Sequence, residues 1–184
     1  MHASVGGDER MRLFVAYTLS LDDRERLSAW QRAELSGSRA RLVPAEQLHF
    51  TIAFLGPRPA EDVEPIWDVV SAAVTAAGPM PLELLRYRET RSVAMLVFGD
   101  KSGEATRVAG DIQHGLEQLG VYKREDRPWL PHVTVLRFRV APRLRPRLPD
   151  LGEISPSEAA AYHSLLRHDG AQYVTLRSVA LGGR

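Results

Sequence analysis

The sequence contains no cysteine, and this absence excludes several classes of protein. Without thiols there is no disulfide scaffold, no thiolate zinc site, no iron–sulfur cluster and no cysteine nucleophile. No apolar run approaches the ~20 residues that a membrane-spanning helix needs, and the polar N-terminus lacks the apolar core of a signal peptide. We therefore expect a cytoplasmic protein that has no association with membranes.

Lysine is almost absent as well, because all basic residues except Lys101 and Lys123 are arginine. The formal net charge is only +1, but the charge is unevenly distributed. Between Val121 and Arg147 eight basic residues accompany two acidic ones, a local net charge of +6. Arginine is suited to bidentate contact with phosphate, so this basic stretch by itself suggests generic nucleic-acid binding. Because it brackets His132 and Thr134 of the motif described below, we expect it to form the rim of a phosphate site.

Hydrophobic periodicity predicts an α+β fold. Strand-like patterns occur at 12–17, 48–55, 82–87, 93–98, 132–139, 159–166 and 173–181. Helical patterns occur at 20–35, 63–77 and 105–119. Hairpin-prone strands between helices favour antiparallel sheets over a strict βαβ alternation. We expect a polar N-terminal tail over 1–10 and a single domain over 11–184, with a loop at 141–149.

The pattern His-x-Thr occurs twice, each time on an expected strand that follows a proline-containing loop. The copies are His49-Phe50-Thr51 and His132-Val133-Thr134, and their histidines are 83 residues apart (132 − 49). A separation of 83 residues along the sequence is too long for a small solenoid repeat. It fits a duplicated α/β lobe, in which the two equivalent strands are brought face to face. Residues i and i+2 of a strand share a face, so each copy offers one imidazole and one hydroxyl to a common cleft.

Two imidazoles and two hydroxyls suit acid–base chemistry on a phosphodiester. Histidine has an unperturbed pKa of ~6.5, so one neutral imidazole can activate water while a protonated one supplies the leaving oxygen with a proton. Threonine hydroxyls can donate to the non-bridging oxygens, where negative charge builds. Catalytic zinc usually takes three protein ligands, and no carboxylate or third histidine shares this spacing. We expect no metal and no other cofactor.

The double motif and its flanks resemble the RNA 2',3'-cyclic phosphodiesterase family, also called the 2'-5' RNA ligase or ThpR/LigT family, of the 2H phosphoesterase superfamily. The resemblance covers the chain from about residue 11 to residue 181. Besides the two motifs, the short segments that carry it are 11–16, 43–44, 54–56, 125–128 and 173–174. It implies a bilobal α+β fold, in which two pseudo-symmetric antiparallel sheets face across a central cleft and helices pack outside. It also implies metal-independent hydrolysis of 2',3'-cyclic phosphate ends of RNA to 2'-phosphomonoesters.

The resemblance assigns roles to the four motif residues. His49 would be the proton donor to the 3' oxygen, and His132 would be the proton acceptor that activates water. Thr51 and Thr134 would hold the phosphate. The implied partner is RNA with a 2',3'-cyclic phosphate end, either tRNA-like or an oligonucleotide. Independently of the resemblance, a monomer is the simplest expectation.

Two further residues follow from the same resemblance, Arg137 as a phosphate contact and Phe14 as an aromatic on the ligand side of the first strand. Arg137 lies five residues after His132, and on a regular strand this odd offset points it away from the cleft. A bulge or the end of the strand could re-aim it, and otherwise it is a surface arginine.

Other functions are compatible with these residues. The reverse reaction, 2'-5' ligation of RNA halves, would use the same groups. A cyclic phosphodiesterase could act on another small substrate, such as a nucleotide or an ADP-ribose derivative. A non-catalytic RNA- or nucleotide-binding module on the same fold needs no matched acid and base, so the intact double motif argues against it. Trp129 could stack on a base from the loop before the second motif.

Overall fold

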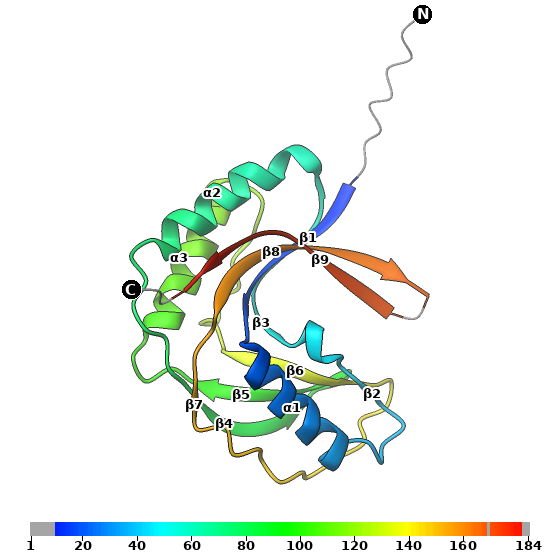
Figure 1. The fold of residues 1–184 in the computed structure, drawn as a ribbon. Helices are drawn as coiled ribbons and strands as arrows, with labels where there is room; N and C mark the ends of the chain where they lie inside the picture. The colour runs from blue at the N-terminus through cyan, green and yellow to red at the C-terminus, as the bar shows by residue number, and fades with distance from the viewer. Residues whose placement is uncertain (1–9, 169, 182–184) are drawn as a thin grey trace, which may run out of the picture.

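The computed structural model describes residues 10–168 and 170–181, which fold into one strongly curved sheet with three helices (Figure 1). The strands are β1 (Arg10–Thr18), β2 (Arg41–Leu42), β3 (His49–Pro59), β4 (Leu82–Glu89), β5 (Val93–Gly99), β6 (His132–Arg137), β7 (Glu153–Ile154), β8 (Glu158–Arg167) and β9 (Gly170–Ala180). The helices are α1 (Leu21–Glu34), α2 (Val63–Val74) and α3 (Glu104–Gln118), with short 3-10 turns η1 (Ala45–Gln47) and η2 (Ala60–Asp62). The expected tail lies outside the described residues, except for Arg10, which begins β1.

The strands form two antiparallel halves that meet at one point. The order is β7-β4-β5-β6-β3-β1-β8-β9, and β2 pairs with β6. Between the halves, β3 and β6 are paired only at Phe50 and Val133. The expected α+β class, with antiparallel sheets and helices outside, is confirmed, and this pair makes the two sheets continuous.

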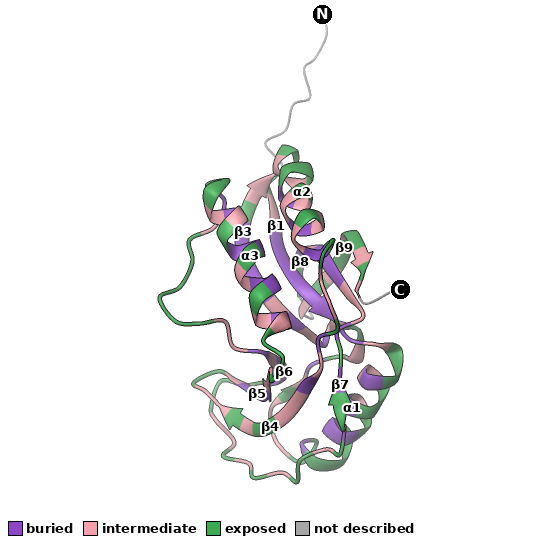
Figure 2. Ribbon diagram, turned by 90° about the vertical axis from the view of Figure 1, so that its left-hand side faces the viewer, coloured by how far each residue is buried: buried purple, intermediate pink, exposed green. Residues whose placement is uncertain are grey.

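The helices cover one face of the curved sheet and bury their apolar sides against it (Figure 2). Helices α2 and α3 lie side by side over the half that contains β1, β3 and β8. Helix α1 begins at the N-cap Ser20, whose side chain accepts a hydrogen bond from the backbone N–H of Asp23. It packs near β6 through Gln31, whose side chain donates to the carbonyl of Val135.

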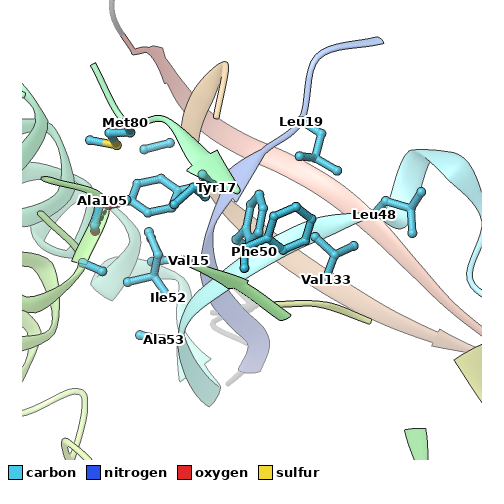
Figure 3. Close-up of a cluster of buried hydrophobic side chains, with 14 of the residues drawn as sticks. Val15, Tyr17, Leu19, Leu48, Phe50, Ile52, Ala53, Met80, Ala105 and Val133 are labelled. Carbon is cyan, nitrogen blue, oxygen red and sulfur yellow. Dashed lines mark hydrogen bonds between the residues drawn. The ribbon is translucent and has the colours of Figure 1, made fainter. Parts of the chain in front are cut away.

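The junction between the halves is filled by large buried side chains (Figure 3). Phe50 is 0% exposed and meets the ring of Phe98 edge-on, with 5.1 Å between centroids. Tyr17 of β1 donates a hydrogen bond to the carbonyl of Ala105 on α3 (2.9 Å). Because Phe50 and Val133 point into this core, the residues on either side of them point to the opposite face of the sheet.

The structure differs from the expected elements in a few places. Strand β3 continues beyond the Gly56-Pro57 pair that was expected to close it, because Leu55 is accommodated as a bulge against β1 and Gly56 adopts φ +69°. Strands β2 and β7 were not predicted, because two residues are too few to show an alternation of apolar and polar side chains. The turn expected at 168–170 contains Asp169, which lies outside the described residues, and β8 and β9 pair on either side of it.

Candidate active site

The two His-x-Thr motifs lie on neighbouring strands and face the same side of the sheet. His49 and His132 are the first residues of β3 and β6, and both are half-buried together with Thr51 and Thr134. The antiparallel pairing is centred on Phe50 and Val133. Extending this register by one residue each way places His49 opposite Thr134 and Thr51 opposite His132. The structure therefore brings the four expected side chains together with pseudo-twofold symmetry.

Each imidazole is oriented by the backbone carbonyl two residues before it. The Nδ1–H of His49 donates to the carbonyl of Gln47 (2.7 Å), and the Nδ1–H of His132 donates to the carbonyl of Leu130 (2.8 Å). A carbonyl can only accept, so Nδ1 carries a proton in both rings, and Nε2 is the atom of each ring left to exchange a proton with another group. The Nε2 of His49 lies 2.9 Å from the hydroxyl of Thr51, and the Nε2 of His132 has no hydrogen-bond partner among the described residues.

The environment of His49 favours its neutral form. Burial lowers the pKa of His49 to about 4, and the positive charges of Arg137, His132 and Arg24 act in the same direction. The hydrogen bond to the carbonyl of Gln47 opposes these effects only in part. At neutral pH His49 of the free protein is therefore uncharged, and the hydroxyl of Thr51 donates to its Nε2.

This environment leads to a prediction for the titration of His49. In the free protein we expect its ring Cε1–H resonance to titrate near pH 4, against ~6.5 for an unperturbed histidine. A bound phosphate monoester such as 2'-AMP should raise the pKa, since its negative charge favours the imidazolium. NMR-monitored titration checks this, and the His49→Ala variant assigns the resonance. A pKa near 6.5 in the free protein, or one that 2'-AMP leaves unmoved, would contradict the prediction.

A bulge in β6 places Arg137 on the cleft face. Opposite β6, the alternating β5 residues Val93, Met95 and Val97 share one face and pair with Arg137, Thr134 and His132, respectively. Two neighbouring residues of β5 thus lie opposite three residues of β6, from Thr134 to Leu136. The extra residue in β6 shifts the alternation by one, so that Arg137 lies on the same face as His132 and Thr134. Both bulge residues point into the core, since Val135 and Leu136 are 0% exposed. Because of the bulge, Arg137 can face the histidines although it lies five residues after His132.

Phe14 lies behind His49 in a cluster of aromatic rings. Its ring centroid is 5.2 Å from that of His49, and it stacks on Tyr162 at 4.9 Å. Tyr173 meets Phe14 edge-on at 4.8 Å and also lies 5.6 Å from the His49 ring. Phe14 is only 3% exposed. Its contact with a ligand stays a prediction, and its packing against the imidazole is what the geometry shows.

Sequence reasoning missed Arg24 and the part that Tyr162 plays at the site. Arg24 follows the N-cap of α1, close to the end of β1 where Thr18 pairs with His49. Its Nε is buried and has no hydrogen-bond partner among the described residues. An arginine in the first turn of an amphipathic helix carries no sequence signal for a site. The pairing of β1 with β3 is what brings it near His49.

A cleft of about 690 Å³ opens beside the second motif and is lined by both Thr51 and His132. The indole N–H of Trp129 donates to the carbonyl of Thr51 (2.8 Å), which fixes this ring in the wall of the cleft. Three basic side chains also line it, Arg88, Lys123 and Arg127, together with Glu125, which forms a salt bridge with Arg127. The cleft thus combines the hydroxyl and imidazole with an aromatic wall and positive charge, a combination that suits a nucleotide.

The described residues bring no three His, Cys, Asp or Glu side chains together as potential metal ligands. In the same part of the chain, every helix is too short or too polar to span a bilayer. Where the two motifs meet, the structure brings together imidazoles and hydroxyls.

The fold and site together define an antiparallel α+β protein of the two-histidine class, in which paired His-x-Thr strands meet at one cleft. The model of the 2'-5' RNA ligase superfamily matches residues 21–168. A protein of Archaeoglobus fulgidus named RNA 2',3'-cyclic phosphodiesterase is 30% identical over 179 residues, which cover 91% of this chain and 98% of that protein. The chain therefore belongs to the 2'-5' RNA ligase superfamily.

Other relatives agree with this assignment. A Thermus thermophilus protein, also named RNA 2',3'-cyclic phosphodiesterase, is 29% identical over 183 residues, 94% of this chain and 91% of its own length. The crystal structure of Escherichia coli LigT with 3'-AMP has a TM-score of 0.80 at 22% identity and covers 95% of this chain and 100% of its own. A solved Thermus thermophilus structure has a TM-score of 0.77 at 27% identity, with 94% and 99% coverage. The LigT likeness shows the fold, which is the one that the sequence resemblance implied.

Proposed function

We propose that this protein is a metal-independent RNA 2',3'-cyclic phosphodiesterase, which opens the cyclic phosphate at an RNA end to a 2'-phosphomonoester. Two relatives that carry this name align over 91% or more of this chain. The observation that carries the proposal is the pairing of the two His-x-Thr motifs on opposed strands. In each motif a backbone carbonyl accepts from the Nδ1–H of the histidine, so its Nε2 is left to transfer a proton.

In the proposed reaction, His132 is the proton acceptor and His49 the proton donor. A water molecule attacks phosphorus while the free Nε2 of His132 takes one of its protons. The bond between phosphorus and the 3' oxygen breaks, and His49 supplies that oxygen with a proton. The products are a 2'-phosphate and a 3'-hydroxyl, with His132 protonated and His49 neutral. Proton exchange with solvent restores the starting state.

The substrate's own charge prepares His49 for the role of donor. Burial and nearby cations keep the pKa of His49 at about 4 in the free protein, and the negative cyclic phosphodiester counteracts both. Protonated Nε2 no longer accepts from Thr51, which lies 2.9 Å away. The hydroxyl of Thr51 then becomes available to donate to a non-bridging phosphate oxygen. Thr134 and Arg137 occupy the same face of β6 and would stabilise the charge that develops there.

An assay with defined products tests the proposed function. Purified protein is incubated with EDTA and a panel of 2',3'- and 3',5'-cyclic nucleotides and of short RNAs with 2',3'-cyclic ends. We expect hydrolysis only of the 2',3'-cyclic substrates, with 2'-phosphate as the product and the same rate without EDTA. Loss of activity with EDTA would contradict the metal-independent reaction. A 3'-phosphate product would contradict the assigned direction of proton transfer.

The reverse reaction is a second candidate, supported by the description of the family as 2'-5' RNA ligases. The same acid and base serve both directions by microscopic reversibility, and the excess of water favours hydrolysis. Product analysis on a nicked tRNA-like substrate distinguishes them. A 2'-5' linked product that accumulates from RNA halves would support ligation, and its absence during active hydrolysis would exclude it under those conditions.

A further inference from the structure

A second, more open groove lies at the far end of β6 and has a volume of about 900 Å³. It is lined by segment 37–41, which follows α1 and includes the start of β2, and by segment 137–142 with Leu144. Four of its lining residues are basic, Arg39, Arg41, Arg137 and Arg139, and none is acidic. The groove is therefore a concentrated positive surface in a protein of net charge +1.

The lining of the groove contains no carboxylate that could neutralise its arginines. Arg41 and Arg137 are directly opposed in the pairing of β2 with β6, which brings two positive charges close together. Within the described residues, Arg39, Arg137 and Arg139 form no salt bridge, and all three are exposed. A multivalent anionic ligand would neutralise several of them at once.

Both walls of the groove are held in place by buried or charge-assisted hydrogen bonds. On one side, the amide of Gln31 donates to the carbonyls of Val43 (3.0 Å) and Val135 (2.7 Å), which fastens β2 to β6. On the other side, the carboxylate of Glu89 accepts from the backbone N–H groups of Arg143 (2.9 Å) and Leu144 (2.7 Å). The groove thus exists before a ligand binds, which reduces the entropy lost on binding.

Arg137 relates the groove to the candidate active site. This residue lines the groove and lies on the same face of β6 as His132 and Thr134. The groove also presents apolar surface, since Phe138 lines it and Val140 is 82% exposed. Positive groups beside apolar surface suit a single-stranded nucleic acid, which offers both phosphates and base faces.

We infer that this groove binds the sugar–phosphate backbone of the RNA nucleotides that precede the cyclic phosphate, through Arg39 and Arg139. The inference rests on the proposed function. It adds a subsite outside the catalytic residues that makes an RNA chain a better substrate than a mononucleotide.

The test compares two double variants that remove the same charge. Arg39→Ala/Arg139→Ala alters the groove, and Arg145→Ala/Arg147→Ala alters exposed arginines of the following loop that do not line it. For each protein, kcat/KM is measured with a hexanucleotide that ends in a 2',3'-cyclic phosphate and with the corresponding cyclic mononucleotide. Affinity for the 2'-phosphate hexanucleotide product is measured by fluorescence anisotropy between 50 and 300 mM salt.

We expect the groove variant to lower the ratio of RNA to mononucleotide efficiency roughly tenfold or more, whereas the control variant keeps the wild-type ratio. Each phosphate contact to single-stranded nucleic acid contributes about −0.7 to the slope of log K against log salt, so losing two should flatten it by about 1.4. An unchanged ratio and slope in the groove variant would overturn the inference. If the wild-type protein hydrolyses neither substrate, the proposed function fails, and the affinity for the product RNA still tests the groove.

Discussion

Replacing His49 or His132 with alanine is expected to lower kcat on a 2',3'-cyclic phosphate end by roughly 10²–10⁴-fold, the usual contribution of a positioned acid or base. Both imidazoles lie on the same face of the sheet, and a backbone carbonyl holds the Nδ1 of each, so each is positioned for a separate proton transfer. Initial rates at saturating substrate measure the loss. His114→Ala is the matched control, because His114 is exposed on α3. A loss within about threefold in either catalytic variant would contradict the acid–base assignment.

The two roles can be separated with a substrate whose leaving 3' oxygen is replaced by sulfur. A thiolate leaves without needing a proton, so general acid catalysis contributes little to its departure. We expect this substrate to restore most of the rate of His49→Ala and to leave His132→Ala as slow as before. Restoration of His132→Ala instead would reverse the assignment of donor and acceptor.

Arg137→Ala is expected to lower kcat/KM on a cyclic mononucleotide by about 10²–10³-fold, the effect of removing one preorganised group that stabilises developing negative charge. The bulge at Val135 and Leu136 brings the guanidinium to the face of His132 and Thr134. Arg137→Lys should recover part of the loss, because it keeps the charge without the planar pair of donors. Steady-state kinetics at low salt measures both variants.

Two further measurements make the Arg137 prediction specific. Arg145→Ala removes the same charge from an exposed position outside the site and should retain wild-type kinetics. Arg137→Ala should also raise the pKa of His49 in the free protein, since the charge of Arg137 is one of the causes that lower it. An activity of Arg137→Ala close to wild type would show that Arg137 is a surface residue.

Local patterns predicted most of the elements that carry this site. Periodicity predicts the strands around both motifs, the three helices and the alternation of motif and core residues, because each of these depends on residues a few positions apart. The repeat of His-x-Thr on two expected strands indicated that the strands meet, which the Phe50–Val133 pair confirms. The predicted end of β3 at Gly56-Pro57 was wrong. Pairing with β1 keeps the chain extended through the bulge at Leu55 and Gly56, as far as Pro59.

By itself, the sequence determined that this protein carries two matched pairs of imidazole and hydroxyl and an arginine-rich second half. Only the tertiary structure decided what those groups can do. The direction of Arg137 depends on a bulge in β6, and this bulge can be recognised only by comparing β6 with the regularly alternating residues of its partner β5. The neutral state of His49 depends on burial and on charges from distant parts of the chain, of which Arg137 has a larger effect than Arg24. Such effects arise from the packing of distant segments, and local periodicity contains no information about them.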